Sequence, residues 1–270
     1  MTDPAPGSPG PAVPSARGSE ASGAFDLLTL AGFAPHHQHA FVVRGPQTQG
    51  PLFKPGPVPR DAILSRMGLE GATLHLVRQV HGAGVVQVPG ATSHPATDES
   101  PSHATAREPE EADAVFTRVR GHAVGVATAD CLPILLAHRD VACAAVHAGW
   151  RGLIAGVIEA AIERLGGGAN LEAAIGPAIG PCCFEVGPEV VARFLERFPD
   201  QRGFVRSVDG DRSRIDLPRA AAHILASRGI EASRVRVADV CTRCRPEGRL
   251  ESYRRDGQNA GRMLAVIGRV

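Results

Sequence analysis

The amino-acid sequence predicts a single α/β or α+β domain, in which buried strands and amphipathic helices follow one another. Three observations support this fold class. Apolar runs of strand length fill the centre of the sequence, and segments with a 3.6-residue apolar period lie between and after them. The chain has 270 residues, 43% of them hydrophobic, which is enough for one large domain or two small ones. No internal repeat is visible, which favours one domain.

The N-terminal part of the chain is expected to be irregular. Residues 1–25 are rich in Pro, Gly, Ser and Ala and are interpreted as a disordered tail, so the folded domain is expected to span residues 26–270. Residues 34–59 are rich in Pro and Gly and have no clear period. The first helix is predicted over Asp61–Leu69, where Gly68 marks its end.

Two strands are predicted next, at residues 74–80 and 85–88, because both runs are dominated by β-branched and other apolar residues. Gly82 and Gly84 lie in the short spacer between them and indicate a tight reversal of the chain. Residues 90–112 are polar and contain three prolines, so they are interpreted as an exposed loop.

The rest of the chain supplies most of the predicted core. Buried strands are predicted at residues 113–117, 122–128, 131–137, 141–147, 171–175, 235–240 and 262–268. One helix is predicted over Leu153–Leu165, where apolar residues recur with the helical period and Gly166 begins a run of three glycines. Two more are predicted over Pro188–Phe198 and Pro218–Ala226. This interleaving of strands and helices is typical of a single α/β or α+β domain.

The composition argues against several classes of partner. The formal net charge is +1 and aromatic residues make up 4%, so neither a basic face nor a stacking platform for nucleic acid is expected. No basic segment leads into an apolar one near the N-terminus, so a signal peptide is not expected. The most apolar stretch, residues 123–137, contains Asp130 and Pro133 and is too short and polar for a membrane span. A cytoplasmic protein is therefore expected, and its oligomeric state is left open.

The six cysteines are too few for a disulfide scaffold and are expected to be reduced, metal-bound or catalytic. Cys241 and Cys244 have the spacing of a zinc knuckle, but a structural zinc site needs a second pair of ligands. Cys182 and Cys183 are adjacent in the sequence, which is poor geometry for chelation. A second metal site is therefore not expected from spacing.

His81, Cys131 and His147 are the main candidates for a metal site. Each is predicted to lie at a strand end, and Gly82 and Gly149 beside the two histidines would let a ligand approach the backbone. Zinc accepts imidazole nitrogen and thiolate sulfur, and three protein ligands leave a fourth position for water or substrate. Spacing alone also allows a buried core cysteine and two histidines bonded to the backbone.

Five segments, in order, resemble the laccase-domain family, whose members are described as polyphenol oxidases and as multifunctional purine nucleoside phosphorylases. The segments are QVHG (79–82), TADCLPI (128–134), VHAGWRG (146–152), AIGPAIGPCCFEVGPEV (174–190) and SYRRDGQNAGR (252–262). The resemblance covers roughly residues 60–270. It implies one α/β sandwich domain with mixed central sheets flanked by helices, of the cysteine-hydrolase type. It also implies that His81, Cys131 and His147 bind zinc and carry the catalysis.

The activity implied by the resemblance is phosphorolysis of adenosine, inosine and methylthioadenosine, with deamination of adenosine as a second reaction. The expected partners are purine nucleosides and phosphate. Arg60 matches an arginine of the family, and Arg151 lies where residues 148–152 open a helix, so both are candidates for binding phosphate. Arg151 is equally open to interpretation as a surface ion pair. Asp130 is open to two interpretations, as a structural residue or as the base that moves protons in deamination.

Three other functions remain open. Copper-dependent phenol oxidation would use copper instead of zinc, and the one His-x-His pair is His37 and His39. A hydrolase would use Cys131 as nucleophile and His147 as base. A non-catalytic role in quality control of cell-wall precursors would leave the metal purely structural.

Overall fold

The computed structural model describes residues 25–45, 51–53, 58–89, 109–139, 141–200, 202–209, 211–245 and 249–269. The predicted tail, residues 1–25, lies outside the described residues except for Phe25. Of the predicted loop, residues 90–112, only residues 109–112 are described. In the part of the chain that the structure describes, no helix has the length and apolar character needed to cross a membrane.

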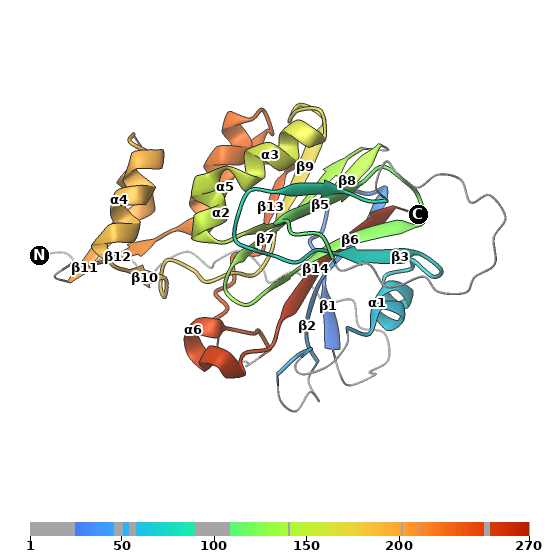
Figure 1. The fold of residues 1–270 in the computed structure, drawn as a ribbon, viewed down its shortest axis with the longest axis horizontal. Coiled ribbons are helices and arrows are strands. Elements are labelled where there is room, and N and C mark those ends of the chain that lie inside the picture. The colour runs from blue at the N-terminus through green and yellow to red at the C-terminus, as the bar shows by residue number, and fades with distance from the viewer. Residues whose placement is uncertain are drawn as a thin grey trace, which may run out of the picture.

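Two mixed sheets form the centre of the molecule (Figure 1). The five-stranded sheet has the order β1 (Phe25–Leu28), β2 (His37–Arg44), β14 (Met263–Arg269), β6 (His122–Thr128) and β3 (Thr73–Leu76). The six-stranded sheet has the order β13 (Val235–Val237), β9 (Leu171–Ile175), β7 (Leu132–His138), β8 (Ala142–Ala148), β5 (Ala114–Thr117) and β4 (Val85–Gln87). Parallel pairs occur at β3–β6, β4–β5 and β9–β13, and all other pairs in these two sheets are antiparallel. The expected mixed α/β sandwich is thus confirmed.

Helices cover the outer faces of the two sheets (Figure 1). On the six-stranded sheet they are α2 (Trp150–Ala155), α3 (Val157–Arg164) and α5 (Leu217–Ser227). On the five-stranded sheet it is α1 (Arg60–Arg66). A small antiparallel sheet projects at one end with α4 (Pro188–Arg197), and its strands are β10 (Glu185–Val186), β12 (Arg212–Ile215) and β11 (Val205–Asp209). The remaining helical turns are α6 (Tyr253–Asp256), η1 (Arg202–Phe204), η2 (Ala232–Arg234) and η3 (Gly257–Asn259).

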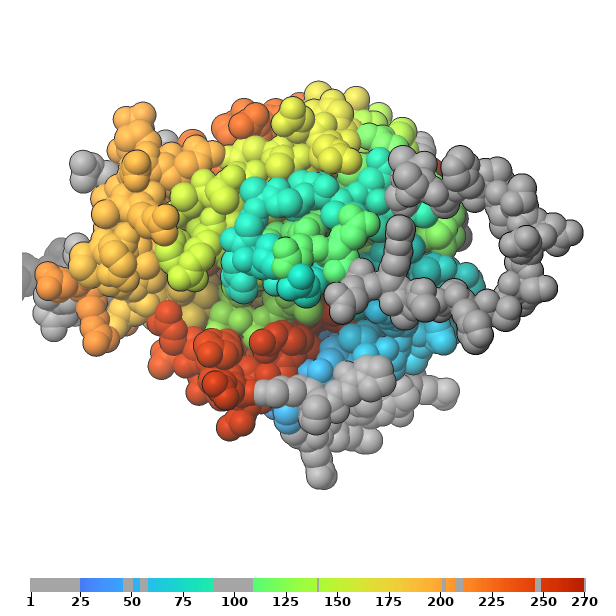
Figure 2. All heavy atoms as spheres, viewed as in Figure 1, coloured from blue at the N-terminus to red at the C-terminus, as the bar shows by residue number. Residues whose placement is uncertain are grey.

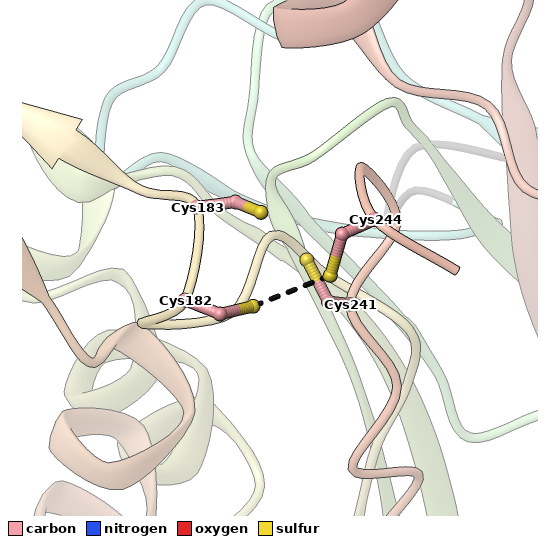
Figure 3. A group of neighbouring side chains, drawn as sticks. All are labelled: Cys182, Cys183, Cys241 and Cys244. Atoms are coloured by element: carbon pink, nitrogen blue, oxygen red, sulfur yellow. Dashed lines mark hydrogen bonds between the residues drawn. The ribbon is translucent and has the colours of Figure 1, made fainter. Parts of the chain in front are cut away.

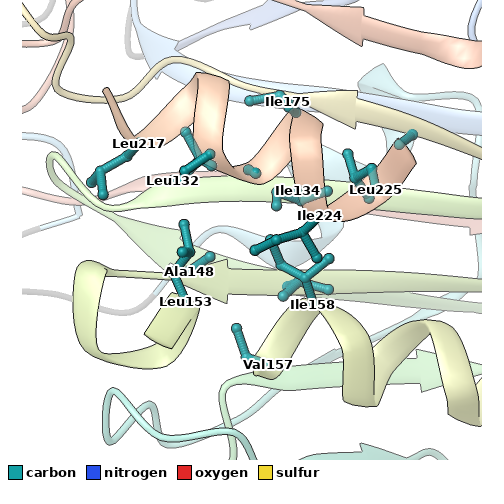
Figure 4. Close-up of a cluster of buried hydrophobic side chains, with 14 of the residues drawn as sticks. Leu132, Ile134, Ala148, Leu153, Val157, Ile158, Ile175, Leu217, Ile224 and Leu225 are labelled. Atoms are coloured by element: carbon teal, nitrogen blue, oxygen red, sulfur yellow. The ribbon is translucent and has the colours of Figure 1, made fainter. Parts of the chain in front are cut away.

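The central strands β7 and β8 are apolar on both faces because they lie between two layers. Leu132 and Ile134 point toward the helices, in the cluster shown in Figure 4, and Val146 belongs to the same cluster. Leu135 and Ala145 point toward the five-stranded sheet and pack in the core between the sheets. Successive side chains of a strand alternate between its faces, so this parity also decides where the polar residues at the strand ends project.

The structure corrects three expectations. The predicted helix Leu153–Leu165 is two helices, because Gly156 takes a left-handed backbone conformation with φ 88° between α2 and α3. The predicted reversal at residues 82–84 is wrong: β3 and β4 belong to different sheets, and the segment between them crosses from one sheet to the other. Residues 34–59, which show no period, contain the interior strand β2, paired with β1 and β14.

Candidate metal centre and its cavity

The structure brings His81, Cys131 and His147 together at one end of the seam between the two sheets. Their candidate ligand atoms all lie within 4.8 Å of one another. The Cys131 Sγ atom is 3.8 Å from His81 Nε2, and the two imidazole rings are 4.8 Å apart at 80°. A tetrahedral zinc ion places a thiolate sulfur and an imidazole nitrogen about 3.6 Å apart. The three side chains therefore fit a metal ion of that size with little movement.

His81 does not end a strand, contrary to the expectation from sequence. It lies in the segment that crosses between the sheets, with φ 59°, a left-handed conformation that is uncommon for residues other than glycine. Asp113 holds this turn, because its carboxylate accepts hydrogen bonds from the backbone N–H groups of Val80 (3.3 Å), His81 (2.9 Å) and Gly82 (2.6 Å). The crossing segment lies at the surface, where Figure 2 shows it in teal between α2 and the C-terminal segment.

Asp113 also orients the second histidine. The Nδ1 atom of His147 donates to Asp113 Oδ1 at 2.8 Å, and both side chains are almost completely buried. This contact leaves His147 Nε2 available to a metal, as in the carboxylate–histidine pairs of many zinc sites. Burial raises the pKa of Asp113, but the hydrogen bonds from His147 and from the backbone of Gly82 and His81 outweigh it and hold the pKa below its ordinary value.

Sequence reasoning missed Asp113. It is the first residue of a predicted buried strand, and its 0% exposure is rare for a carboxylate without a partner. An acidic residue at the start of an otherwise apolar strand is the one local signal that could have identified it. Its partners are more than thirty positions away in the sequence, so no spacing rule connects them.

Cys131 lies between the end of β6 and the start of β7. Burial, and the charge of Asp130 beside it, raise the pKa of the Cys131 thiol to about 12. Such a thiol is protonated at neutral pH, whereas nucleophilic cysteines have lowered pKa values. A metal ion displaces this proton when it binds, so metal affinity rises with pH. The raised pKa argues against a free thiolate nucleophile, and the convergence of Cys131 with His81 and His147 is what favours a metal ligand.

Asp130 is a structural residue of this centre. Its Oδ1 accepts from the Thr242 hydroxyl at 2.5 Å, and its Oδ2 accepts from the backbone N–H of Arg254 at 2.6 Å. Its own backbone carbonyl accepts from Ile179 N–H at 2.9 Å. Both carboxylate oxygens are occupied, which agrees with the structural interpretation rather than the role of base.

Gly149 lets helix α2 begin beside the candidate metal ligands. A Cβ atom at this position would lie 3.0 Å from Cys131 Sγ and 3.1 Å from His81 Cδ2. Contacts this short are tighter than most in folded proteins, so a side chain here would push the Cys131 thiol or the His81 ring aside by a few tenths of an ångström. The sequence expectation that glycine permits close approach at this point is met by geometry.

A cavity of about 470 Å³ opens beside the three candidate ligands. Ile179 and Phe184 form an apolar wall, and Tyr253, Arg254 and Arg262 contribute polar groups to its lining. This volume is typical of small-molecule sites. The helical turn that carries Tyr253 and Arg254 thus supplies part of the cavity.

The two arginines predicted to bind phosphate lie elsewhere. Arg60 begins α1, donates to the carbonyl of Leu74 at 3.3 Å and lines a separate hollow formed by residues 58–62. Arg151 lies on α2 with its guanidinium 4.5 Å from the centre of the Trp150 ring, and it is not among the residues that line the main cavity. Arg151 still acts on the centre: burial, then His147, then Arg151 and Arg262 lower the pKa of His81, against the opposing effect of Asp113.

The His-x-His pair considered for copper lies in β2. His39 accepts a hydrogen bond from Leu30 N–H at 3.1 Å and contacts the Phe33 ring edge-on. Burial lowers the pKa of His39 to about 4. Within the described residues, two groups of side chains could hold a metal ion, namely the three ligands above and a set of four cysteines. The His37–His39 pair belongs to neither group.

Comparison with curated proteins finds relatives over most of the chain. A purine nucleoside phosphorylase of Pseudomonas aeruginosa is 38% identical over 192 residues, which cover 70% of this chain and 71% of that protein. The Escherichia coli purine nucleoside phosphorylase YfiH is 37% identical over 194 residues, with coverage of 71% and 72%. An adenosine deaminase, RL5, from an unknown prokaryotic organism is 38% identical over 164 residues, and this match spans 62% of its length.

Solved structures share the fold. A Neisseria meningitidis protein matches with a TM-score of 0.73 at 27% identity, covering 90% of this chain and 98% of that one. YlmD from Geobacillus stearothermophilus matches with a TM-score of 0.75 at 24% identity, covering 94% and 99%. A family model described as multi-copper polyphenol oxidoreductase laccase matches residues 59–270. The chain therefore belongs to the multi-copper polyphenol oxidoreductase laccase family.

Proposed function

We propose that this protein is a zinc-dependent purine nucleoside phosphorylase that also deaminates adenosine. The observation that carries the proposal is the group His81, Cys131 and His147 at the edge of a cavity with apolar and basic walls. The names of the relatives, purine nucleoside phosphorylases and an adenosine deaminase, support this substrate class. All six cysteines are thiols in the structure, which suits the reducing cytoplasm.

Zinc is the metal that we propose for the centre. Two imidazole nitrogens and one thiolate suit tetrahedral zinc with one open position. Copper is the alternative, and it would require further histidine sites for laccase chemistry. Zinc supplies Lewis-acid chemistry at such a position. Asp113 fixes the orientation of His147 and the turn that carries His81, so the ligands are held in place before a metal binds.

We assign the binding of the nucleoside base and of phosphate to different parts of the cavity lining. We assign the purine to Phe184, Ile179 and Tyr253, because aromatic and apolar side chains bind a flat heterocycle by packing against its faces. We assign phosphate to Arg254 and Arg262, whose guanidinium groups can donate charge-assisted hydrogen bonds.

Three residues considered from the sequence have other roles in this proposal. Arg151 adds positive potential near the centre, since its charge is felt at both His81 and Cys131. Arg60 is assigned no contact in this cavity, because it lines another hollow. Asp130 is assigned no proton transfer in deamination, because both of its oxygens already accept hydrogen bonds.

The test is product analysis with purified, zinc-loaded protein. Inosine with phosphate should yield hypoxanthine and ribose 1-phosphate, and adenosine should yield adenine and inosine. Omitting phosphate should abolish base release and leave deamination in place. Replacing Cys131 by alanine should abolish both reactions. Cys143→Ala is the matched control, because Cys143 is a buried cysteine between the sheets and outside the cavity.

Two results would contradict the proposal. Wild-type turnover by Cys131→Ala would remove the centre from the reaction. Stoichiometric copper in the purified protein, together with phenol oxidation and no nucleoside turnover, would favour the oxidase function instead.

A further inference from the structure

Four cysteines from two segments far apart in the sequence lie close together beside the cavity wall that contains Phe184. Cys182 and Cys183 lie in a turn between β9 and β10, and Cys241 and Cys244 follow β13 (Figure 3). Their Sγ atoms all lie within 4.8 Å of one another, and those of Cys182 and Cys244 are 3.5 Å apart. A zinc ion bound by four thiolates holds its sulfur atoms about 3.8 Å apart. We propose that these four cysteines bind a second, structural zinc ion.

The adjacent pair chelates in spite of its sequence spacing. Cys183 and Phe184 both donate their backbone N–H groups to the carbonyl of Gly180, which winds the chain into a tight turn. Both sulfur atoms of the pair consequently point toward those of Cys241 and Cys244 (Figure 3). Adjacent cysteines were expected to be poor chelators, but this turn places both of them as a second pair of candidate ligands.

The second segment has the Cys-x-x-Cys spacing of a zinc knuckle and turns between its two cysteines. Gly180 N–H donates to Cys241 Sγ at 3.3 Å. Amide donors of this kind stabilise a thiolate, which is the form that binds zinc. A Cβ atom at position 180 would lie 3.3 Å from Cys182 Sγ, so glycine is suited to the close packing of the two segments.

The charge of the site is partly balanced by its surroundings. Four thiolates and one zinc ion carry a net charge of −2, and the positive charge of Arg243 lies close enough to Cys183, Cys241 and Cys244 to interact with them. A disulfide is the competing arrangement for Cys182 and Cys244. Their Sγ atoms are too far apart for an S–S bond of about 2.05 Å, and a disulfide would use two of the four thiols that converge here.

The position of this site gives it a structural part in the cavity. Cys241 pairs with Ala178 in an isolated parallel β-bridge, and Thr242 N–H donates to the Ala178 carbonyl at 3.0 Å. Thr242 then reaches Asp130 through its hydroxyl group. The next residue along, Ile179, belongs to the cavity wall. A zinc ion bound by the four cysteines would therefore hold together the two segments that support this wall.

The test counts zinc bound to the full-length protein under reducing conditions, and it does not depend on nucleoside turnover. Wild-type protein should bind two zinc ions per chain. Cys244→Ser and Cys182→Ser should each bind one, and Cys131→Ala should also bind one. Cys143→Ser, the matched control, should bind two. One zinc ion in wild type, retained in full by Cys244→Ser, would overturn the proposal.

Cobalt spectroscopy distinguishes the two sites, and circular dichroism detects variants that fail to fold. In Cys131→Ala protein, Co²⁺ should give intense sulfur-to-cobalt charge-transfer absorption from four thiolates, and adding Cys244→Ser should greatly reduce it. Circular dichroism should show that these variants keep native secondary structure, with Cys244→Ser melting at a lower temperature than wild type. A Cys182–Cys244 disulfide in protein purified with reductant and zinc, detected as a mass lower by two hydrogen atoms, would equally refute the site.

Discussion

Replacing Asp113 by asparagine tests how the metal ligands are held. The side chain keeps its shape and loses its charge and one acceptor. Oδ1 accepts from His81 N–H and His147 Nδ1, and Oδ2 accepts from Val80 N–H and Gly82 N–H. In either orientation the new amide NH₂ faces two groups that donate to the carboxylate. The variant therefore cannot satisfy the four contacts at once.

The magnitude follows from those contacts. An unsatisfied buried donor costs about 1–3 kcal/mol, so the variant should be less stable by roughly 2–4 kcal/mol after partial relaxation. Losing the carboxylate behind a histidine ligand weakens metal binding by about 10–100-fold. Glu111→Gln is the matched control, because Glu111 lies two residues away and forms an exposed ion pair with Arg78. Exposed pairs contribute about 0–1 kcal/mol, so this control should resemble wild type.

Two assays measure these effects. Competition for zinc with a fluorescent chelator gives the affinity of the centre, and it should be done in a Cys244→Ser background so that the four cysteines do not contribute. Urea denaturation gives the free energy of unfolding. If Asp113→Asn bound zinc as tightly as the Glu111→Gln control, the orienting role assigned to Asp113 would be refuted.

Three further predictions concern other parts of the structure. Gly149→Ala should weaken zinc binding by at least about tenfold in the chelator assay, because its Cβ would lie 3.0 Å from Cys131 Sγ. The free energy of unfolding should fall by roughly 3 kcal/mol as pH drops from 6.5 to 4, because the unfolded chain binds a proton at His39 while the folded protein, with a pKa of about 4, does not. Urea denaturation across this pH range should show a smaller fall for His39→Gln. Glu251→Gln should destabilise the protein by about 2–4 kcal/mol in the same assay, because it breaks a buried ion pair with Arg44.

The sequence predicts the strands of the core well and the polar contacts poorly. Strands such as β7 and β8 are buried on both faces, so their apolar runs are unambiguous. Strand β2 was missed because its first residues, His37 to His39, are polar and because Pro and Gly are frequent on both sides of it. The reversal after β3 was wrong because glycines in a crossing between sheets resemble those of a hairpin.

The sequence singles out the three candidate ligands of the metal centre, but not the residues that support them. His81, Cys131 and His147 stand in short motifs, and a motif is a local pattern that one sequence can display. Asp113 and the four converging cysteines depend on contacts between residues far apart in the chain, which only the folded backbone brings together. Arg60 and Arg151 lie outside the lining of this cavity, which their motifs could not indicate, and their roles in binding phosphate stay predictions.

Asp130, the neighbour of Cys131, connects the candidate metal centre to the segment that carries Cys241 and Cys244. Asp130 adopts φ 85°, a left-handed conformation that costs a residue with a Cβ about 1–2 kcal/mol. Hydrogen bonds to a charged group contribute about 1.5–3 kcal/mol each, so the one from the Thr242 hydroxyl suffices to offset this strain. Thr242 lies between Cys241 and Cys244 in the sequence, and its position therefore depends on whether those cysteines are held by a metal ion. Loss of metal from the four cysteines should consequently weaken metal binding at the candidate centre, because it alters the backbone conformation that places the Cys131 thiol. This effect needs no substitution of His81, Cys131 or His147.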